Sequence, residues 1–188
     1  MTRIAVILGS TRPGRRGEAV ARWFYKIAED RTDADYELVD IADFALPHLD
    51  EAAPPSMGQY DRPHTQAWAR KIASFDGFVF VTPEYNHSTS GALKNAIDFL
   101  YAEWNNKAAG FVSYGSVGGT RAVEHLRLVM AELQVATVRA QVALSLFTDF
   151  QDFSAFTPAE HQVAAAQAVL DQTVAWSRAL APLRAAQS

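Results

Sequence analysis

The stretch that decides the fold predicted for this chain is Ile4-Ala5-Val6-Ile7-Leu8, which is followed by Gly9-Ser10. Five consecutive apolar residues, rich in β-branched types, are typical of a strand that is covered on both faces, as in a parallel sheet. Four later runs predict further strands: residues 36–41, 77–81, 108–114 and 135–146, the last of them interrupted. Because helical patterns separate these runs, the sequence predicts right-handed strand–helix–strand crossovers and a doubly wound α/β sheet.

Five helices are predicted between and after these strands. Apolar residues recur at helical spacing in four places: from Glu18, over 65–75, from about Ser90 and over 122–133. Thr157-Pro158-Ala159-Glu160 has the pattern of a capping box, with threonine at the N-cap, and predicts the start of a final helix that ends near Leu180. The proline-bearing segment 42–63 is long for a connection in a compact domain, so it is a candidate functional loop or lid.

The composition excludes several classes of protein. The 188 residues include 17 Lys and Arg against 21 Asp and Glu, and the formal charge of −4 argues against a general binder of nucleic acid or membranes. There is no cysteine, which excludes disulfides, thiolate nucleophiles, iron–sulfur clusters and cysteine-based zinc sites. No apolar run approaches the about 20 residues of a membrane helix, and no signal peptide is visible. We expect one domain over residues 1–188, located in the cytoplasm.

Ligands of doubly wound sheets bind at the carboxyl ends of the strands, so three loops are expected to meet at one crevice. The first loop, residues 9–17, reads Gly-Ser-Thr-Arg-Pro-Gly-Arg-Arg-Gly and lies between a buried strand and a helix. Free backbone N–H groups and the helix dipole favour an anion there. Its three arginines predict a phosphate monoester as the guest, because a guanidinium binds phosphate bidentately. The alternative is a solvated basic turn.

Two known phosphate-binding motifs are absent from the first loop. Gly9 and Gly14 have the spacing of a P-loop, but Arg15-Arg16 replaces its Lys-Ser/Thr, so the hydroxyl that would hold magnesium is missing. The glycine fingerprint of dinucleotide-binding folds fails at Thr11. Asp40, where such a fold would place a ribose-binding acid, is therefore interpreted as a loop-start or helix-capping residue.

The second and third loops offer a surface for a flat ring. In the second loop, residues 82–87, Tyr85 presents an apolar face and Asn86 can pair with the edge of a heteroaromatic ring. In the third loop, residues 113–119, small residues let the backbone approach a planar ligand. Taken alone, the second loop is better explained as an ordinary turn, and His87 as a surface residue, while the third loop is evenly balanced. Together with the first loop they indicate a mononucleotide-like cofactor.

Three segments resemble the NAD(P)H-dependent FMN reductases, a flavodoxin-like family that includes chromate, quinone and azo reductases. They are Gly9-Ser10-Thr11-Arg12-Pro13-Gly14-Arg15, Pro83-Glu84-Tyr85-Asn86 and Ser90-Gly91-Ala92-Leu93-Lys94-Asn95-Ala96-Ile97-Asp98. The resemblance covers nearly the whole chain. It implies a three-layer α/β/α domain whose five-stranded parallel sheet has the order 2-1-3-4-5, with FMN as the bound cofactor and NADPH or NADH as electron donor.

The same resemblance assigns the cofactor site to the three loops. It places the FMN phosphate on Ser10, Arg12 and Arg15, in a loop that also supplies Gly9 and Thr11. Four residues would line the isoalloxazine: Pro83, Glu84, Tyr85 and Asn86. Ser113 and Gly115 would flank it. Many members of the family have serine and asparagine where this chain has Arg15 and Gly17.

The function that follows from the resemblance is that of a two-electron oxidoreductase. Hydride would pass from NAD(P)H to the flavin, and a small-molecule acceptor would then take two electrons at the same face, which implies ping-pong kinetics. The acceptor would be a quinone, an azo compound, a metal oxyanion or free flavin. No catalytic side chain is assigned, because hydride transfer requires no protein acid or base. Two alternatives stay open: a flavodoxin-like electron carrier without NAD(P)H turnover, and a flavin-free binding or scaffold protein.

Four phenylalanines recur every three positions before the last predicted helix: Phe147, Phe150, Phe153 and Phe156. Helical core packing is one interpretation, but exposed aromatic residues in a connection are typical of a subunit interface. Tyr101 and Trp104 are expected to join this interface. We therefore expect a homodimer or a dimer of dimers. The five histidines show no metal-ligand spacing, so no metal site is expected.

Overall fold

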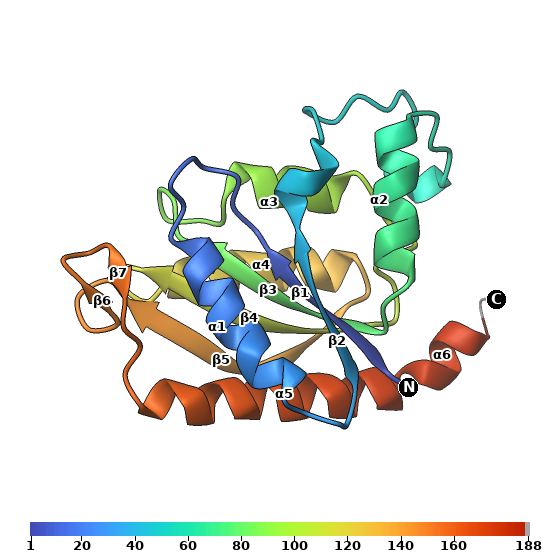
Figure 1. The fold of residues 1–188 in the computed structure, drawn as a ribbon. Coiled ribbons are helices and arrows are strands. Elements are labelled where there is room, and N and C mark those ends of the chain that lie inside the picture. The colour runs from blue at the N-terminus through green and yellow to red at the C-terminus, as the bar shows by residue number, and fades with distance from the viewer. Residues whose placement is uncertain (187–188) are drawn as a thin grey trace.

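A five-stranded parallel sheet forms the middle layer of the protein in the computed structural model, which describes residues 1–186 (Figure 1). The strands are β1 (Arg3–Leu8), β2 (Asp35–Asp40), β3 (Gly77–Pro83), β4 (Ala108–Gly115) and β5 (Ala136–Ser145). Their order in the sheet is β2-β1-β3-β4-β5, with every neighbouring pair parallel. This confirms the flavodoxin-like fold and the strand order that the sequence led us to expect.

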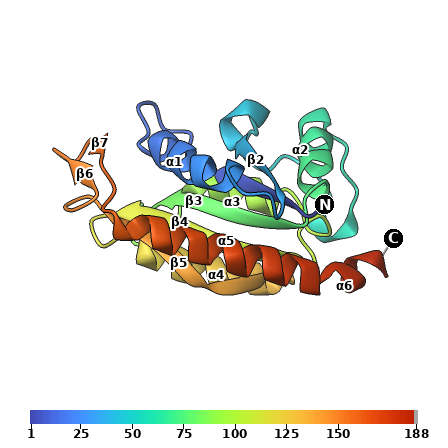
Figure 2. The ribbon, with the colours of Figure 1, turned by 60° about the horizontal axis from the view of Figure 1, so that its bottom comes forward.

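Helices cover both faces of the sheet (Figure 2). One face is covered by α1 (Gly17–Glu29) and α5 (His161–Ala179), the other by α2 (Pro63–Ala73), α3 (Gly91–Asp98) and α4 (Thr120–Glu132). Successive residues of β1 point to opposite faces of the sheet. Val6 packs in the core beneath α1 and α5, whereas Ala5 and Ile7 pack in the core beneath α2, α3 and α4. All three side chains are fully buried, which is why the sequence of this strand shows no polar alternation.

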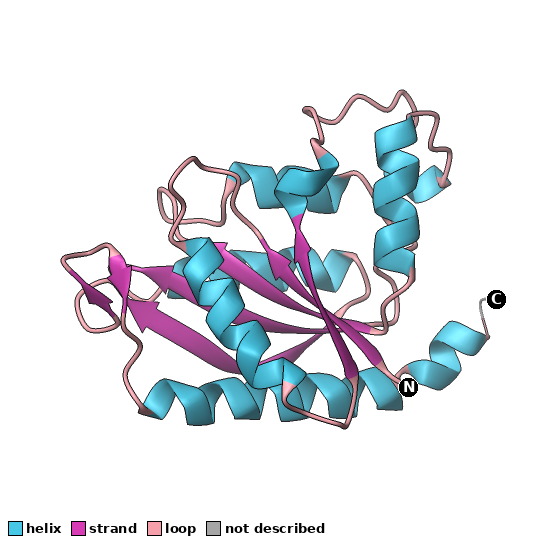
Figure 3. Ribbon diagram, viewed as in Figure 1, coloured by secondary structure: helices cyan, strands magenta, loops and turns pink. Residues whose placement is uncertain are grey.

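Short helices also occur in two further segments of the chain. The long segment after β2 contains two short helices, η1 (Ile41–Phe44) and η2 (Pro55–Met57), and α5 is followed by a short helix, α6 (Ala181–Ala185). The expected interruption of the last strand is wrong: β5 is continuous from Ala136 to Ser145, although its register against β4 shifts between Ala109 and Phe111. In Figure 3 the loops after β1, β3 and β4 gather at the edge toward which the strand arrows point. Within residues 1–186 no helix is both long and apolar enough to cross a membrane.

The predicted capping box at the start of the last helix is wrong. Helix α5 begins at His161, and Glu160 occupies its N-cap position with helical backbone angles and no capping side chain. The carboxylate of Asp149, 1% exposed, organises this region instead. It accepts hydrogen bonds from the backbone N–H of Ser145 (2.9 Å) and of Ala159 (3.0 Å), at the two ends of the connection between β5 and α5.

The connection that Asp149 closes contains a small hairpin, β6 (Phe150–Gln151) and β7 (Ala155–Phe156), rather than a helix. Phe150 and Phe156 lie against each other, with ring centroids 5.1 Å apart, and pack on the α1/α5 core. Phe147 and Phe153 are 67% and 52% exposed, and their rings meet edge to face at 5.4 Å. The regular spacing of the four phenylalanines therefore reflects two inward and two outward positions.

The expectation that Trp104 contributes to a surface is wrong. Its side chain is fully buried, and its indole N–H donates to the Ile97 carbonyl at 3.1 Å. The ring packs against Trp68, with ring centroids 6.2 Å apart, and against Phe78 at 4.9 Å. Trp104 is thus part of the core between the sheet and helices α2 and α3.

Candidate cofactor site

A pocket of about 230 Å³ lies at the carboxyl edge of the sheet, between the loops that follow β1, β3, β4 and β5. We call it the edge pocket. The residues that line it are Arg12, Arg16, Pro83, Glu84, Tyr85, Tyr114, Gly115 and Leu146. Five of the sequence-predicted site residues are therefore brought together there: Arg12, Pro83, Glu84, Tyr85 and Gly115.

A tight turn positions Tyr85 on the wall of the edge pocket. The backbone N–H of Tyr85 donates to the Ser88 carbonyl at 2.9 Å, and the Ser88 N–H donates back at 3.1 Å. The two residues between them, Asn86 and His87, have φ angles of 49° and 71°, the left-handed values of a two-residue hairpin turn. Asn86 is consequently exposed at the tip of the turn, and the structure does not place it among the residues that line the pocket.

Ser10 and Arg12 hold Tyr85 from the side of the first loop. The hydroxyls of Ser10 and Tyr85 share a hydrogen bond of 3.2 Å, and Ser10 is only 1% exposed. The guanidinium of Arg12 lies 5.9 Å from the centre of the Tyr85 ring, at the distance of a cation–π contact. Ser10 therefore orients the tyrosine, while Arg12 places a positive charge at the pocket wall.

Two buried polar atoms of the edge pocket have no hydrogen-bond partner among the described residues: the Tyr114 hydroxyl and Nε of Arg16. Tyr114 is only 6% exposed. Burial, followed by the neighbouring Tyr85, raises the pKa of Tyr114, so its hydroxyl stays a donor at neutral pH. A buried donor without a partner costs free energy, and a ligand that brings acceptor oxygens removes that cost.

Arg15 does not face the edge pocket. Its guanidinium donates to both carboxylate oxygens of Asp40, to Oδ1 at 2.9 Å, and also to the Ser10 carbonyl. Asp40 in turn accepts the backbone N–H of Ala42 at 2.9 Å and so caps η1, as its interpretation as a capping residue predicted. The bidentate pair leaves Arg15 engaged within the protein, and it joins the first loop to the end of β2.

Three further predicted residues lie outside the edge pocket. Thr11 lines a different pocket, between η1 and α3. Gly9 allows the first loop to pack closely against Leu93, since a Cβ atom at position 9 would lie 2.7 Å from Leu93 Cδ2. Ser113 is fully buried, and its hydroxyl donates to the Gly118 carbonyl at 2.6 Å. Successive strand residues point to opposite faces, so Ser113 cannot share the orientation of Tyr114.

The sequence did not assign Tyr114 or Leu146 to the site, and it included Arg16 only among the three arginines of the first loop; all three residues line the edge pocket. Each lies at or just beyond the carboxyl end of a strand or at the start of a helix, which is the signal by which they could have been found. Choosing between Arg15 and Arg16, or between Ser113 and Tyr114, required knowledge of which neighbour points toward the pocket.

The charge of Glu84 on the pocket wall is offset by Arg121. The Glu84 carboxylate, whose side chain is 5% exposed, accepts the Nε–H of Arg121 at 2.6 Å, a second guanidinium N–H and the Arg121 backbone N–H at 3.2 Å. A further guanidinium nitrogen lies 3.0 Å from Nδ1 of His87. With Glu84 neutralised in this way, Arg12 and Arg16 make the lining of the pocket attractive to an anion.

The sequence matches the model of the family described as NADPH-dependent FMN reductase over residues 2–149. The chain belongs to this family. Family membership confirms the resemblance seen in the three segments, and with it an oxidoreductase that uses FMN and NAD(P)H.

Relatives and solved structures agree with this family. The chain is 43% identical over 149 residues to an NAD(P)H-dependent FMN reductase of Schizosaccharomyces pombe, with 78% of this chain and 74% of the relative covered. It is 36% identical over 140 residues to the quinone reductase of Escherichia coli K12, with 69% and 70% covered. The structure of FerB, a flavoenzyme NAD(P)H:(acceptor) oxidoreductase from Paracoccus denitrificans, has a TM-score of 0.74 at 22% identity and covers 95% of this chain and 98% of FerB. At that identity it supports the fold alone.

Proposed function

We propose that this FMN reductase binds FMN in the edge pocket and transfers two electrons from NADPH or NADH to a small-molecule acceptor. Acceptors of four classes fit this chemistry: quinones, azo compounds, metal oxyanions and free flavin. The observation that carries the proposal is the pair of unpartnered donors, the Tyr114 hydroxyl and Arg16 Nε, in a pocket whose wall also holds Arg12. A phosphate monoester supplies the acceptor oxygens that these groups lack.

The first loop and the start of α1 would hold the phosphate. Helix α1 begins at Gly17, directly after Arg16, and the N–H groups of its first turn lack partners within the helix. Arg12 and Arg16 would supply charged hydrogen bonds, and Tyr114 a neutral one. This assignment replaces Arg15, which is bound to Asp40, with Arg16.

The second and third loops would hold the flat ring. Pro83 and Tyr85 form one wall of the pocket, and Gly115 lies on the neighbouring strand. A Cβ atom at Gly115 would lie 3.2 Å from Glu84 Cβ, so glycine allows the two loops to approach each other. The backbone N–H groups of Ser116 and Val117 donate to no residue of the described chain, and they are available to ring oxygens.

FMN, when bound, supplies the redox chemistry: it accepts hydride from NAD(P)H and passes two electrons on to the acceptor. The residues of this chain bind the cofactor, orient it and set the charge around it; Glu84, neutralised by Arg121, leaves the pocket free of an opposing anion. Donor and acceptor would both have to reach the ring beside Tyr85, so they would bind in turn. This order predicts ping-pong kinetics.

We also propose that residues 1–188 form one domain that acts in the cytoplasm as a homodimer or a dimer of dimers. The exposed and mutually touching rings of Phe147 and Phe153 support this assembly, since exposed aromatic pairs are typical of interfaces. They follow Leu146, which lines the edge pocket, so this interface would lie beside the cofactor.

Purification and anaerobic titration test the proposed function. We expect a yellow protein whose flavin absorption bleaches on addition of NADPH or NADH, and parallel lines in double-reciprocal plots with a quinone as acceptor. A yellow protein that neither nicotinamide bleaches would instead be an electron carrier. A colourless protein that gains no flavin from excess FMN would contradict the cofactor assignment altogether.

A further inference from the structure

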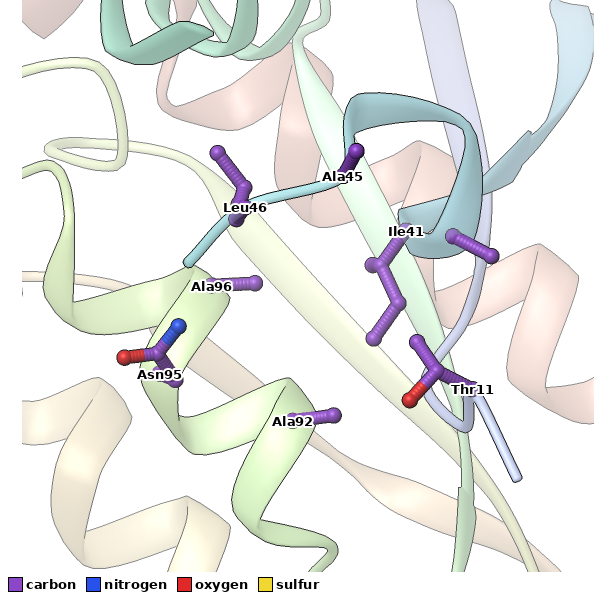
Figure 4. Close-up of a pocket in the computed structure, with 8 residues that line it drawn as sticks. Thr11, Ile41, Ala45, Leu46, Ala92, Asn95 and Ala96 are labelled. Atoms are coloured by element: carbon purple, nitrogen blue, oxygen red, sulfur yellow. The ribbon is translucent and has the colours of Figure 1, made fainter. Parts of the chain in front are cut away.

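A second pocket, of about 310 Å³, lies on the other side of the first loop, between η1 and α3 (Figure 4). We call it the side pocket. Its lining residues are Thr11, Ile41, Ala42, Ala45, Leu46, Ala92, Asn95 and Ala96. Its volume falls in the range of about 300–1,000 Å³ that is common for small-molecule sites.

The walls of the side pocket are closely spaced and combine apolar with polar surface. Ala92 and Ala96 lie one turn apart on α3, and Figure 4 shows their methyl groups directed toward the segment that carries Ile41 and Ala45. The short alanine side chains leave a slot between helix and loop. Thr11 and Asn95 add a hydroxyl and an amide at its margin. A flat heteroaromatic ring with polar edges has this combination of surfaces.

Hydrogen bonds within the protein fix the shape of the side pocket. The Asn95 amide donates to the Pro47 carbonyl at 2.7 Å and accepts the backbone N–H of Leu49 at 3.0 Å, which holds the segment after η1 against α3. The Arg15–Asp40 pair joins the opposite end of η1 to the first loop. The slot therefore exists before any ligand arrives, as is usual for small-molecule sites.

Only the first loop lies between the side pocket and the edge pocket. Thr11 lines the side pocket, and the next residue, Arg12, lines the edge pocket. Their Cα atoms are about 3.8 Å apart because they are consecutive. The backbone N–H groups of Thr11 and Gly14 donate to no other group in residues 1–186, so the loop offers N–H donors to an anion that crosses it.

We propose that the side pocket binds the adenosine half of NAD(P)H, whose nicotinamide half would lie against the flavin held in the edge pocket. The inference rests on the proposed function, since it needs an electron donor that reacts in the edge pocket. A nicotinamide dinucleotide is two nucleosides with flat bases, joined by a pyrophosphate. That sequence of groups matches a pocket, a loop with anion-binding N–H groups and a second slot of mixed polarity. Arg12, Arg16 and Tyr114 remain for the FMN phosphate.

Filling the slot tests the proposal. Ala92 is half-buried at the margin of the core, so Ala92→Phe places a ring in the side pocket, and its thermal unfolding is compared with that of the control variant. We expect the Kd of NADH for the holoenzyme, measured by rapid anaerobic mixing, to rise at least about tenfold. The Kd of reduced nicotinamide mononucleotide, which lacks adenosine, and that of FMN should stay unchanged. The control is Ala131→Phe, an exposed alanine of α4 outside both pockets. An equal rise for both donors, or none for either, would overturn the proposal.

A second measurement needs neither electron transfer nor the variant. Alanine-methyl NMR of the wild-type protein with 5′-AMP as the probe should shift the signals of Ala92 and Ala96, and NADH should displace the AMP. Shifts confined to the edge pocket, or shifts of Ala92 and Ala96 that follow protein concentration rather than AMP, would contradict the assignment. Failure of NADH to bleach bound flavin would refute the proposed function instead, because AMP binding is read independently of it.

Discussion

The phenolic oxygen of Tyr114 lies 2.5 Å from the point that a Cβ atom on residue 17 would occupy. Gly17 thus provides the space in which a buried donor of the edge pocket sits. A side chain at position 17 and the Tyr114 hydroxyl therefore cannot share this space.

Gly17→Ala should displace the Tyr114 hydroxyl. We expect the free energy of unfolding to fall by about 1–3 kcal/mol, the usual cost of overpacking, and the affinity for FMN to fall with it. Thermal unfolding and flavin titration measure both. In the double variant Gly17→Ala/Tyr114→Phe the contact with the hydroxyl is removed, so stability should recover in part while FMN affinity stays low. Recovery is partial because Leu8 Cδ1 and the ring carbon Cζ of residue 114 still lie 3.0 Å and 3.3 Å from the new methyl group. Recovery of FMN affinity would show that the hydroxyl does not touch the cofactor.

Arg16→Ala and Arg15→Ala should separate phosphate binding from folding. Arg16→Ala should weaken FMN binding by about 1.5–3 kcal/mol, the value of a hydrogen bond to a charged group, and should leave riboflavin binding unchanged because riboflavin has no phosphate. Arg12→Ala should behave in the same way. Arg15→Ala leaves Asp40 without its partner, so it should lower thermal stability more than FMN affinity. Flavin fluorescence titrations of the three variants decide this, and a greater loss of FMN affinity in Arg15→Ala than in Arg16→Ala would reverse the assignment.

Phe147→Asp combined with Phe153→Asp should dissociate the proposed dimer. Both side chains are exposed, so the change removes apolar contact area at an interface without opening the core. Sedimentation velocity should show the mass fall toward the 20.6 kDa of one chain. Trp176→Asp is the matched control, since Trp176 is 50% exposed on the outer face of α5. A wild-type protein that sediments as a monomer at all concentrations would refute the assembly.

Lys107 should give the stability of the protein a distinct dependence on pH. It is 5% exposed and donates to the Ile72 carbonyl at 2.9 Å; burial, and secondly Arg184, lowers the pKa of Lys107 to about 8. Between pH 8 and the ordinary lysine value of 10.5 the unfolded chain binds more protons than the native one, so the free energy of unfolding should rise with pH. Below pH 8 both states are charged and the destabilisation is complete.

Urea unfolding of wild type and Lys107→Met at pH 7.5, 9 and 10.5 isolates this effect, because the other titrating groups are common to both proteins. The difference between their unfolding free energies should shift in favour of the wild type as the pH rises. A difference independent of pH would mean that the amine keeps its ordinary pKa in the folded protein.

Much of the fold was predictable because the strands are strongly patterned. β1 and β3 are apolar along almost their whole length, since both faces of a parallel sheet are buried, and an unbroken apolar run of strand length fits few other environments. The start of the last helix was mispredicted for a reason of tertiary structure. The sequence of residues 157–160 favours a helix N-terminus. The backbone N–H of Ala159 instead donates to the carboxylate of Asp149, and the helix begins only at His161.

The candidate site was predictable to the level of the loop and not to that of the side chain. The edge of the sheet follows from topology, which brought Arg12, Tyr85 and Gly115 together as expected. Which of two adjacent arginines faces the pocket depends on a partner distant in sequence, Asp40, which engages Arg15. The local sequence pattern does not reveal a partner that is distant in the chain. It also did not reveal that Trp104 is buried.

The way Asp149 closes the β5–α5 connection has a practical consequence for engineering. One carboxylate fastens both ends of this connection, at Ser145 and Ala159, so the tip of the hairpin near Asp152 is mechanically isolated from the sheet. Foreign peptides inserted at that tip should leave the sheet and its helices intact and lie close to Leu146 and the proposed cofactor site. They would also obstruct the proposed interface at Phe147 and Phe153. The hairpin thus provides a natural grafting point for redox biosensors or for tethering a chosen electron acceptor.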